Sequence, residues 1–522
     1  MKGIDICLKI HMIATKYLRA SANIDPKVAT LAAMAYDSVN GFIRTRVVPV
    51  EDKQLGHFAR KEGVKSLDSW ELPESSSGGL QVLKDSAKLL REGSIPVAFP
   101  TETVYGLGAD ATRSEAVKGI FKAKGRPSDN PLIIHVCDLN MLRDILVTNN
   151  MNGSNCNDPV PEIYKPLIDR FWPGPLTILL PTPEHSILAP EVTAGLKTFG
   201  VRMPDSPLAL CLIKLAGVPI AAPSANASTK PSTTTAEHVL HDLDGRIEVI
   251  LDGGSCEVGV ESTIVDGLCD PPVILRPGGI SINSIRECSG WKHVKIAYKD
   301  ELETNGDAPR APGMKYKHYS PKAKIILAEN SADIVPKDIL DFRLELGNTD
   351  GSSLVDFKGP PYEQTHNDAF KLPVVGIVRT RHWAPWGGFN GNSWTHVVPH
   401  SLDSRSQDIV TLNSNSKSHV TGNIQEGHIY TNSNNDESPL LLAKIIEISL
   451  GSDTKAIAHG LFSALRELDK RNVDLIYVEG IEDDGYDHFQ NFNGSLAPRG
   501  DEGDIAAAIM NRLRKAATVV KY

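Results

Sequence analysis

The sequence predicts an α/β protein with two folded domains: a twisted sheet of mixed strand direction, followed by a smaller βαβ-type unit. A chain of 522 residues is too long for one hydrophobic core, so at least two domains are expected. Between residues 80 and 285, short apolar runs alternate with helical patterns. These runs outnumber those of a doubly wound parallel sheet, which favours a sheet that also contains antiparallel strands.

Residues 1–78 are expected to form an N-terminal extension that is largely disordered. They hold one apolar patch, at 28–36, and end in Pro73–Gly79, which has the composition of a linker. Lysines and an arginine surround short apolar runs in the first 20 residues, a weak pattern of a mitochondrial presequence. We therefore expect a cytoplasmic protein and leave open an additional mitochondrial pool.

The first domain is predicted over residues 79–285. It begins with a helix that repeats Leu80, Leu83, Ala87 and Leu90 at helical spacing. Strands are predicted at 95–99, 132–136, 176–180, 198–203, 218–222, 247–251, 261–266 and 272–276. Helices are predicted at 113–124, 160–171, 207–216 and 234–242. An Asn-rich stretch at 149–158 is interpreted as a surface insertion.

A connector at 286–322, which contains Ala308–Pro321, leads to a second domain at 323–520. Its predicted strands are 324–328, 374–379, 444–450 and 474–478. A helix with Ala458, Leu461 and Leu465 on one face joins the last two strands, and a helix at 504–517 closes the domain. The segment 381–437 is rich in Asn, Ser, Gly and His, and we expect it to be a disordered insertion.

Composition excludes several classes of protein. The net charge of -9 argues against broad electrostatic capture of nucleic acid, which needs clustered Lys and Arg. The seven cysteines form no CxxC pair and no zinc spacing, which indicates reduced thiols inside a cell. No run approaches the ~20 apolar residues of a membrane span, so no membrane association is expected.

The segment Pro100–Gly108, PTETVYGLG, is the first candidate for chemistry. It follows a predicted buried strand and precedes Thr112-x-x-Glu115, which reads as a capping box at a helix start. Hydroxyls and a carboxylate at the end of a strand, with glycines that let backbone approach a ligand, favour a small-molecule site. Taken alone, the segment is better explained as ordinary turn chemistry, and the motifs downstream strengthen the interpretation as a site.

A second candidate is the end of the helix at 113–124. Lys122 and Lys124 could merely complement the negative helix end, whereas Arg126 lies in a short Gly-Arg-Pro loop and is placed to bind phosphate. Gly125 is the expected terminating residue. His135, within an apolar strand, is by default a core histidine, but it could also contact a small polar substrate.

Four further strand segments carry polar groups. Ser224 and Asn226 flank Ala225, so both could face one pocket, although an Asx or Ser turn explains them equally well. Arg202 interrupts an apolar strand and needs a charged partner, which a substrate carboxylate would supply. The segments Glu261–Thr263 and Arg276–Gly279 repeat this pattern.

Six motifs now stand in a fixed order: PTETVYGLG, KGRPSDNPLIIH, FWPGPLT, APSAN, VESTIVD and ILRPGG. With the connector motif APGMKYKHYSP, the chain resembles the YrdC-like family, and within it the long-form threonylcarbamoyl-AMP synthases that carry a C-terminal extension. The resemblance implies a YrdC-like domain with a twisted mixed sheet, then a Rossmann-like domain. It also implies a nucleotidyltransferase that condenses L-threonine, bicarbonate or CO2, and ATP to threonylcarbamoyl-AMP and diphosphate.

The resemblance assigns roles to particular residues. A catalytic constellation is implied at Lys124, Arg126, Ser224 and Asn226. Contacts to threonine are implied for Thr103, His135, Arg202, Ala222 and Ser262. Contacts to ATP are implied for Arg126, Asn130, Thr198, Ser224, Ser232, Arg276 and a connector tyrosine, either Tyr316 or Tyr319.

The resemblance also implies partners. Mg²⁺ would be held mainly through the ATP phosphates, with no metal site of the protein's own. The product would pass to a separate complex that modifies the adenosine beside the anticodon of ANN-decoding tRNAs, and no stable tRNA binding is expected.

Two alternatives from other classes stay open at this point. One is an RNA-binding YrdC-like module that makes no adenylate. The other is a carbamoyltransferase of the hydrogenase-maturation type, which would carry zinc-binding CxxC fingers that this sequence lacks.

Overall fold

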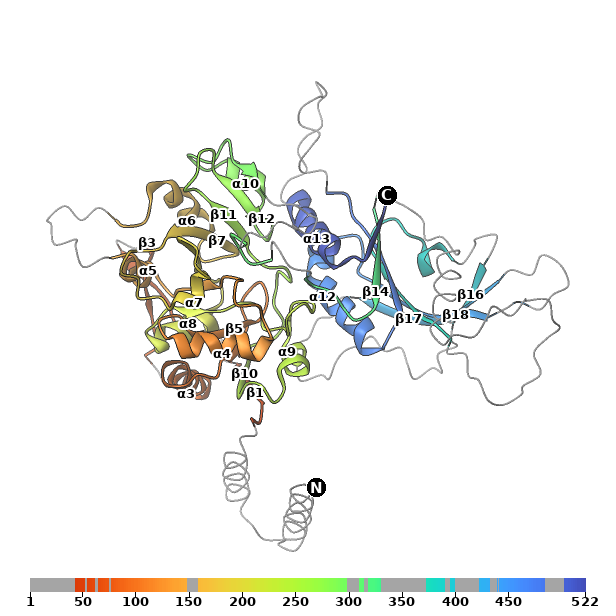
Figure 1. Ribbon diagram of the computed structural model, residues 1–522, viewed down its shortest axis with the longest axis horizontal. Coiled ribbons are helices and arrows are strands. Elements are labelled where there is room, and N and C mark those ends of the chain that lie inside the picture. Colours follow the sequence, from red (N-terminus) through yellow and green to blue (C-terminus); the bar gives the residue numbers. More distant parts are fainter. Residues whose placement is uncertain are drawn as a thin grey trace, which may run out of the picture.

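The computed structural model describes residues 43–522 apart from 52–53, 62–63, 75–76, 148–157, 298–308, 314–317, 330–371, 390–394, 400–421, 432–438, 440 and 484–501. Two α/β units lie side by side, each built on its own large sheet (Figure 1). The expected surface insertion at 149–158 falls almost entirely outside the described residues.

The first unit is built on a mixed sheet whose strand order in the described residues is β1-β10-β4-β5-β9-β6-β8-β7-β11-β12-β13. The central strands are β4 (Val97–Phe99), β5 (Gly106–Asp110), β6 (Ile133–His135), β7 (Leu176–Pro181), β8 (Thr198–Arg202), β9 (Ile220–Ala221), β10 (Val249–Asp252), β11 (Thr263–Asp266) and β12 (Val273–Arg276). Parallel pairs such as β6–β8 alternate with antiparallel pairs such as β7–β8. The predicted mixed α/β sheet is therefore confirmed.

Helices cover this sheet. They are α3 (Gly78–Glu92), α4 (Ser114–Lys124), α5 (Leu139–Leu146), η1 (Glu162–Tyr164), α6 (Lys165–Phe171), α7 (Pro190–Thr193), α8 (Pro207–Ala216), α9 (Ala236–Leu243) and α10 (Ile282–Arg286). Leu80, Leu83, Ala87 and Leu90 form the buried face of α3, as their spacing predicts. The capping box predicted at Thr112 is wrong. Arg113 is the N-cap of α4, and the Thr112 hydroxyl instead donates to Asp110 at 2.7 Å.

The expectation of a disordered segment up to residue 78 is wrong for its second half. β1 (Arg46–Pro49) pairs in parallel with β10 and extends the sheet. β2 (His57–Lys61) and β3 (Val64–Glu71) form a hairpin whose Phe58 and Trp70 join the core of the first unit. None of these three strands shows the apolar–polar alternation that predicts a strand. β1 is stabilised by its pairing with β10, about 200 residues further along the chain.

The first unit also extends beyond residue 285. β13 (Lys295–Ile296) pairs with β12, and Trp291 is fully buried in the first core. The connector therefore begins about ten residues later than predicted.

The second unit has the sheet order β16-β17-β18-β15-β19-β14-β20 in its described part. Its elements are β14 (Lys324–Ala328), β15 (Val374–Arg379), η3 (Pro385–Gly388), β16 (Thr395–Pro399), β17 (Asn423–Thr431), β18 (Leu441–Ser449), α12 (Thr454–Lys470), β19 (Leu475–Glu479), α13 (Glu502–Ala516) and β20 (Val519–Lys521). Parallel pairing of β18, β15, β19, β14 and β20 gives the expected Rossmann-like arrangement.

The segment 381–437 is not wholly a disordered insertion, which corrects the prediction. It supplies η3, β16 and β17, and β17 pairs with β18 over almost its full length. The composition of the segment gave no signal for these elements. β17 is stabilised by pairing with β18, which lies outside the segment.

The helices α12 and α13 lie between the two sheets (Figure 1). Their apolar faces pack in one cluster with Val104 and Val260 of the first unit. Val104 and Val260 of the first unit therefore belong to a core cluster of the second unit at this contact.

Candidate active site

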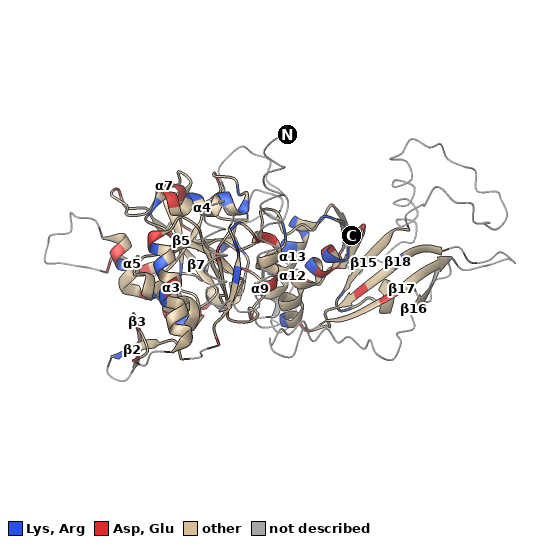
Figure 2. Ribbon diagram, turned by 90° about the horizontal axis from the view of Figure 1, so that it is seen from below, with Lys and Arg blue, Asp and Glu red and all other residues tan. Residues whose placement is uncertain are grey.

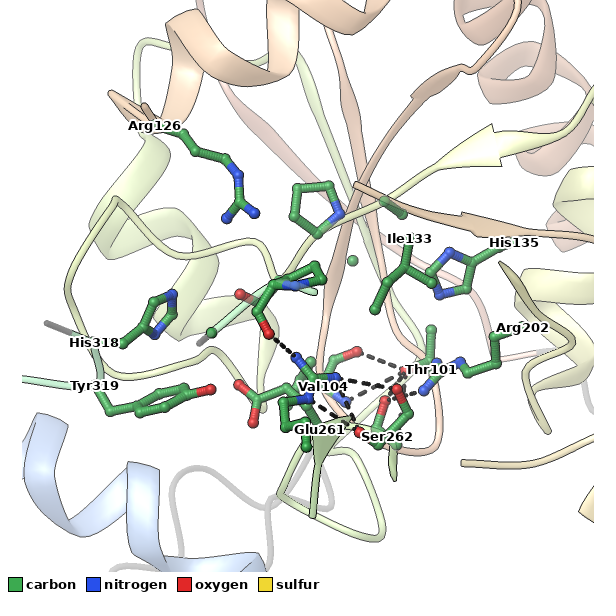
Figure 3. A pocket seen from close by; sticks show the side chains of 18 residues that line it. Thr101, Val104, Arg126, Ile133, His135, Arg202, Glu261, Ser262, His318 and Tyr319 are labelled. Atoms are coloured by element: carbon green, nitrogen blue, oxygen red, sulfur yellow. Dashed lines mark hydrogen bonds between the residues drawn. The ribbon is translucent and has the colours of Figure 1, made fainter. Parts of the chain in front are cut away.

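A pocket lies where several strands of the first unit end, and the connector closes one side of it (Figure 3). Arg126 lies on one wall, and His135 and Arg202 lie on the opposite wall (Figure 3). His318 and Tyr319 of the connector lie on the side that faces the second unit.

Nine of the residues named from the sequence line this pocket: Thr103, Arg126, His135, Arg202, Ala222, Ser224, Ser262, Arg276 and Tyr319. They come from segments spread over more than 200 residues. These nine positions therefore meet at one cavity of the structure, and their roles in binding stay predictions.

Arg202 is a buried cation in the pocket wall. Its Nη1 donates to the Thr103 hydroxyl at 2.9 Å, and its Nη2 lies 3.6 Å from a carboxylate oxygen of Glu102. Burial lowers the pKa of Arg202 and raises the pKa of Glu102. Within the described structure, the Arg202 Nε has no hydrogen-bond partner. The guanidinium therefore keeps capacity to bind a small anion.

His135 faces the same wall and is 5 % exposed. Burial lowers the pKa of this histidine well below its usual value, and the nearby Arg202 cation lowers it further. The imidazole is therefore neutral at physiological pH and can exchange hydrogen bonds with a polar ligand without adding charge.

Lys124 does not line the pocket but lies buried behind it. Its ammonium donates to the backbone oxygens of Ser224 and Asn226, and the Asn226 Oδ1 lies 3.4 Å away. Burial, with Arg126 as the next cause, lowers the pKa of Lys124 well below its usual value. Lys124 thus holds the loop after β9, which corrects the helix-end interpretation, and its place in the catalytic constellation stays a prediction.

Asn226 and Asn130 also lie outside the pocket lining, against expectation. The Asn226 amide donates to Ala227 and Lys230 oxygens at 2.9 Å, and its Oδ1 accepts from Ser224. The predicted alternation around Ala225 fails because this segment is a loop rather than a strand. Asn130 is buried, and its backbone oxygen accepts from the Arg126 Nε at 3.4 Å.

Two of the residues expected to contact nucleotide lie elsewhere. Ser232 is buried just outside the lining and donates its hydroxyl to Glu261. Thr198 lines a small adjoining pocket together with Arg310 and Pro312. The expected contact of Thr198 with ATP therefore stays a prediction. Of the two connector tyrosines, Tyr316 lies outside the described residues, and Tyr319 lines the main pocket.

Arg276 is held at the pocket by the backbone of neighbouring segments. Its Nη2 donates to the Ser262 backbone oxygen at 3.0 Å, and its Nη1 donates to Pro312 of the connector at 3.2 Å. Burial lowers the pKa of Arg276 to about 10. The cation therefore persists at neutral pH beside the connector.

Sequence reasoning missed several residues of this site. Thr101, Glu261, Gly313 and His318 line the pocket, and Arg512 of α13 contacts Glu261 from the second unit. Thr101 belongs to the PTETVYGLG motif and Glu261 to the VESTIVD motif, so these motifs could have indicated both residues. No sequence signal marks Arg512.

Metal and membrane features are absent from the described part of the chain. No three His, Cys, Asp or Glu side chains gather there as metal ligands. No helix of the described residues is long and apolar enough to span a membrane.

Family comparisons agree with this architecture. A Sua5/YciO/YrdC family model, described as "Telomere recombination", matches residues 88–278, and a second model, described as "Threonylcarbamoyl-AMP synthase, C-terminal domain", matches residues 280–518. The fold and the pocket therefore define a YrdC-like protein with a C-terminal extension.

Individual relatives show to which family within this class the chain belongs. The chain is 40 % identical to the threonylcarbamoyl-AMP synthase of Schizosaccharomyces pombe over 453 residues, 84 % of this chain and 88 % of the relative. It is 51 % identical to the Bacillus subtilis protein of the same name, over 50 % of this chain and 70 % of the relative. The solved Pyrococcus abyssi Sua5, complexed with L-threonine, has a TM-score of 0.59 and 31 % identity, covering 92 % of this chain and all of that one. The chain belongs to the threonylcarbamoyl-AMP synthase family.

Proposed function

We propose that this protein is an L-threonylcarbamoyladenylate synthase, which condenses L-threonine, bicarbonate or CO2, and ATP. The single observation that carries the proposal is one pocket lined by the buried cations Arg126, Arg202 and Arg276. An amino-acid carboxylate and a nucleoside triphosphate are both anionic, and buried guanidinium groups suit both.

Threonine would occupy the wall formed by Arg202, Thr103 and His135. Arg202 would bind the carboxylate, because its Nε has no protein partner in the described structure. The neutral His135 would exchange a hydrogen bond with a polar group of the substrate. Ala222 and Ser262, on the same lining, would complete the contacts. The Pyrococcus abyssi relative was solved with L-threonine, which supports this class of ligand.

ATP would occupy the opposite side, with Arg126, Arg276, Ser224 and Tyr319 around it. Mg²⁺ would enter with the phosphates. The residues present fit this role, because Glu261 is the one carboxylate in the described lining and it is already engaged by Arg512 and Ser232. A carboxylate cage for the ion is therefore missing from the described pocket, and substrate oxygens would hold it.

The reaction would proceed by positioning and charge neutralisation. The amine nitrogen of threonine attacks the carbon of CO2 and loses a proton, which forms a carbamate. A carbamate oxygen then attacks the α-phosphorus of ATP, and the bond to diphosphate breaks. The guanidinium groups neutralise the charge on the carbamate and on the leaving diphosphate.

The connector is suited to cover the bound reactants. Pro312, Gly313, His318 and Tyr319 line the pocket. Both the carbamate and the acyl adenylate hydrolyse readily, so excluding water would preserve the product.

The product would serve tRNA modification. A separate transferase complex would move the threonylcarbamoyl group to the adenosine beside the anticodon of ANN-decoding tRNAs. We place the enzyme in the cytoplasm, with an additional mitochondrial pool as a further proposal. Acidic and basic residues are interspersed over both units (Figure 2), which supports transfer of a small product rather than stable tRNA binding.

The direct test uses purified full-length protein with ATP, Mg²⁺, bicarbonate and labelled threonine. We expect labelled threonylcarbamoyl-AMP and an equal amount of diphosphate, both dependent on bicarbonate. A tRNA gel shift at physiological salt is run in parallel. Tight tRNA binding without any adenylate product would contradict the synthase proposal and favour the RNA-binding alternative.

A further inference from the structure

Arg512 of the second unit reaches the wall of the pocket in the first. Its side chain is fully buried, and its Nε donates to the Glu261 carboxylate at 3.0 Å. Its Nη1 donates to the backbone oxygen of Pro277, and its guanidinium carbon lies 5.8 Å from the centre of the Tyr319 ring. One side chain of α13 thus contacts a strand end, the ILRPGG motif and the connector.

The Glu261 carboxylate places a negative charge in a pocket that is proposed to bind phosphates. It lines the pocket, and its buried carboxylate accepts hydrogen bonds from Arg512 and from Ser232. Burial alone would raise the pKa of Glu261, but Arg512 and then Arg276 outweigh it and bring the pKa to about 2. The pocket therefore contains a permanent negative charge, which would repel the triphosphate unless a cation neutralises it.

Arg276 is the other cation close to Glu261. Its hydrogen bonds, however, go to neutral acceptors: Ser262 backbone and hydroxyl oxygens and the Pro312 backbone oxygen. A buried carboxylate that lost Arg512 would require a new charged partner, because an unpaired buried charge is strongly unfavourable. Arg276 is the candidate, because after Arg512 it is the cation that acts most strongly on the Glu261 carboxylate, and pairing with Glu261 would withdraw it from an anionic ligand.

We propose that Arg512 is a positioning residue for nucleotide binding, which pairs with Glu261 so that Arg276 stays available to the phosphates of ATP. The second unit thereby contributes a charge on which the pocket of the first unit depends. This inference rests on the proposed function for the identity of the ligand. It also couples the docking of α13 to the affinity for nucleotide.

The test compares Arg512→Met, Glu261→Gln and the double variant in the full chain. Arg512→Met should raise the KM for ATP at least about tenfold, with the KM for threonine nearly unchanged. The double variant should recover most of the ATP affinity, since the amide that replaces the Glu261 carboxylate carries no charge that needs a partner. Arg514→Met is the matched control, because Arg514 lies on the same helix but pairs with Glu329 and Asp483 of the second unit.

Binding of a non-hydrolysable ATP analogue, measured by calorimetry, supplies a readout that does not depend on turnover. If the wild type binds the analogue but makes no adenylate, the proposed function is wrong. The role of Arg512 in nucleotide binding is then still decided by the calorimetric comparison of the variants. If Arg512→Met does not fold by circular dichroism, Arg512→Lys replaces it, with a smaller loss of ATP affinity expected. An equal rise in both KM values, or no recovery in the double variant, would show that Arg512 has a structural role and does not position Arg276.

Discussion

Arg466 of α12 and Asp242 of α9 form a buried, two-pronged ion pair between the two units. The Arg466 Nη2 and Nη1 donate to the two carboxylate oxygens at 2.9 and 3.2 Å, and the Asp242 side chain has no exposed area. Although burial opposes ionisation, Arg466 holds the pKa of Asp242 well below its usual range. The two units are therefore joined by charge as well as by apolar packing.

Breaking this pair should weaken the contact between the units. Arg466→Met leaves a buried carboxylate with Lys230, 3.0 Å away, and His241, 3.1 Å away, as its remaining side-chain partners. We expect a loss of about 3 kcal/mol in the free energy of unfolding, measured with urea. The double variant Arg466→Met/Asp242→Asn should be more stable than the single one, and equal losses in both would argue against the charge explanation.

Gly259 allows α12 to approach the first unit. Its φ is +81°, and an added Cβ would lie 2.5 Å from the His459 Cα and 2.6 Å from the Ala458 oxygen. Gly259→Ala should therefore separate the units and increase protease cleavage between them. Gly254 is a matched control with φ +92° and no atom within 4 Å of an added Cβ. Its alanine variant bears the same kind of backbone strain without the clash and should keep the units docked.

Arg202→Ala should raise the KM for threonine far more than the KM for ATP. One lost charge-assisted hydrogen bond costs about 1.5–3 kcal/mol, equivalent to roughly a 10- to 150-fold change. Steady-state kinetics with each substrate varied in turn gives both constants. Arg202→Lys keeps the charge beside Glu102 and should lose less. If both KM values rose together, Arg202 would not be assigned to threonine.

Lys124→Met should lower both stability and adenylation activity, because the loop oxygens of Ser224 and Asn226 would lose their donor. Each buried acceptor left unpaired costs about 1–3 kcal/mol. Thermal unfolding and diphosphate release are the two measurements. Lys122, on the exposed side of the same helix end, provides the control Lys122→Met. A stable but inactive Lys124→Met protein would instead indicate direct contact with substrate.

The buried His135 should make stability depend on pH. Because its pKa is lowered in the folded protein, the unfolded chain binds the proton more readily near pH ~6. Stability is then fully present above pH ~6.5 and is lost as the pH falls, by up to about 1.4 kcal/mol per pH unit. Urea unfolding between about pH 5 and 8 should show a shallower slope for His135→Gln than for wild type. Parallel slopes would mean that folding does not change the pKa of His135.

The candidate site was readable from the sequence wherever a polar residue lies at or next to the end of a buried strand. Thr103, Arg202, Ser262 and Arg276 lie at strand ends, and neighbouring strands bring their ends to one edge of a sheet. The positions of side chains in and beside loops were predicted less well. The Asn226 amide donates to a backbone oxygen of its own loop, and the Lys124 ammonium donates to a backbone oxygen of that same loop. These local hydrogen bonds to the backbone set the directions of both side chains.

By itself, the sequence determined most of the central strands and helices, the mixed character of the first sheet and the family, since apolar periodicity and short motifs are local properties. Only the tertiary structure decided that β1 joins the sheet, that Lys124 lies behind the pocket and that Arg512 pairs with Glu261. These features depend on contacts between residues up to 251 positions apart. Such contacts leave no local pattern, because their free energy arises from burying and pairing groups that the chain brings together only when it folds.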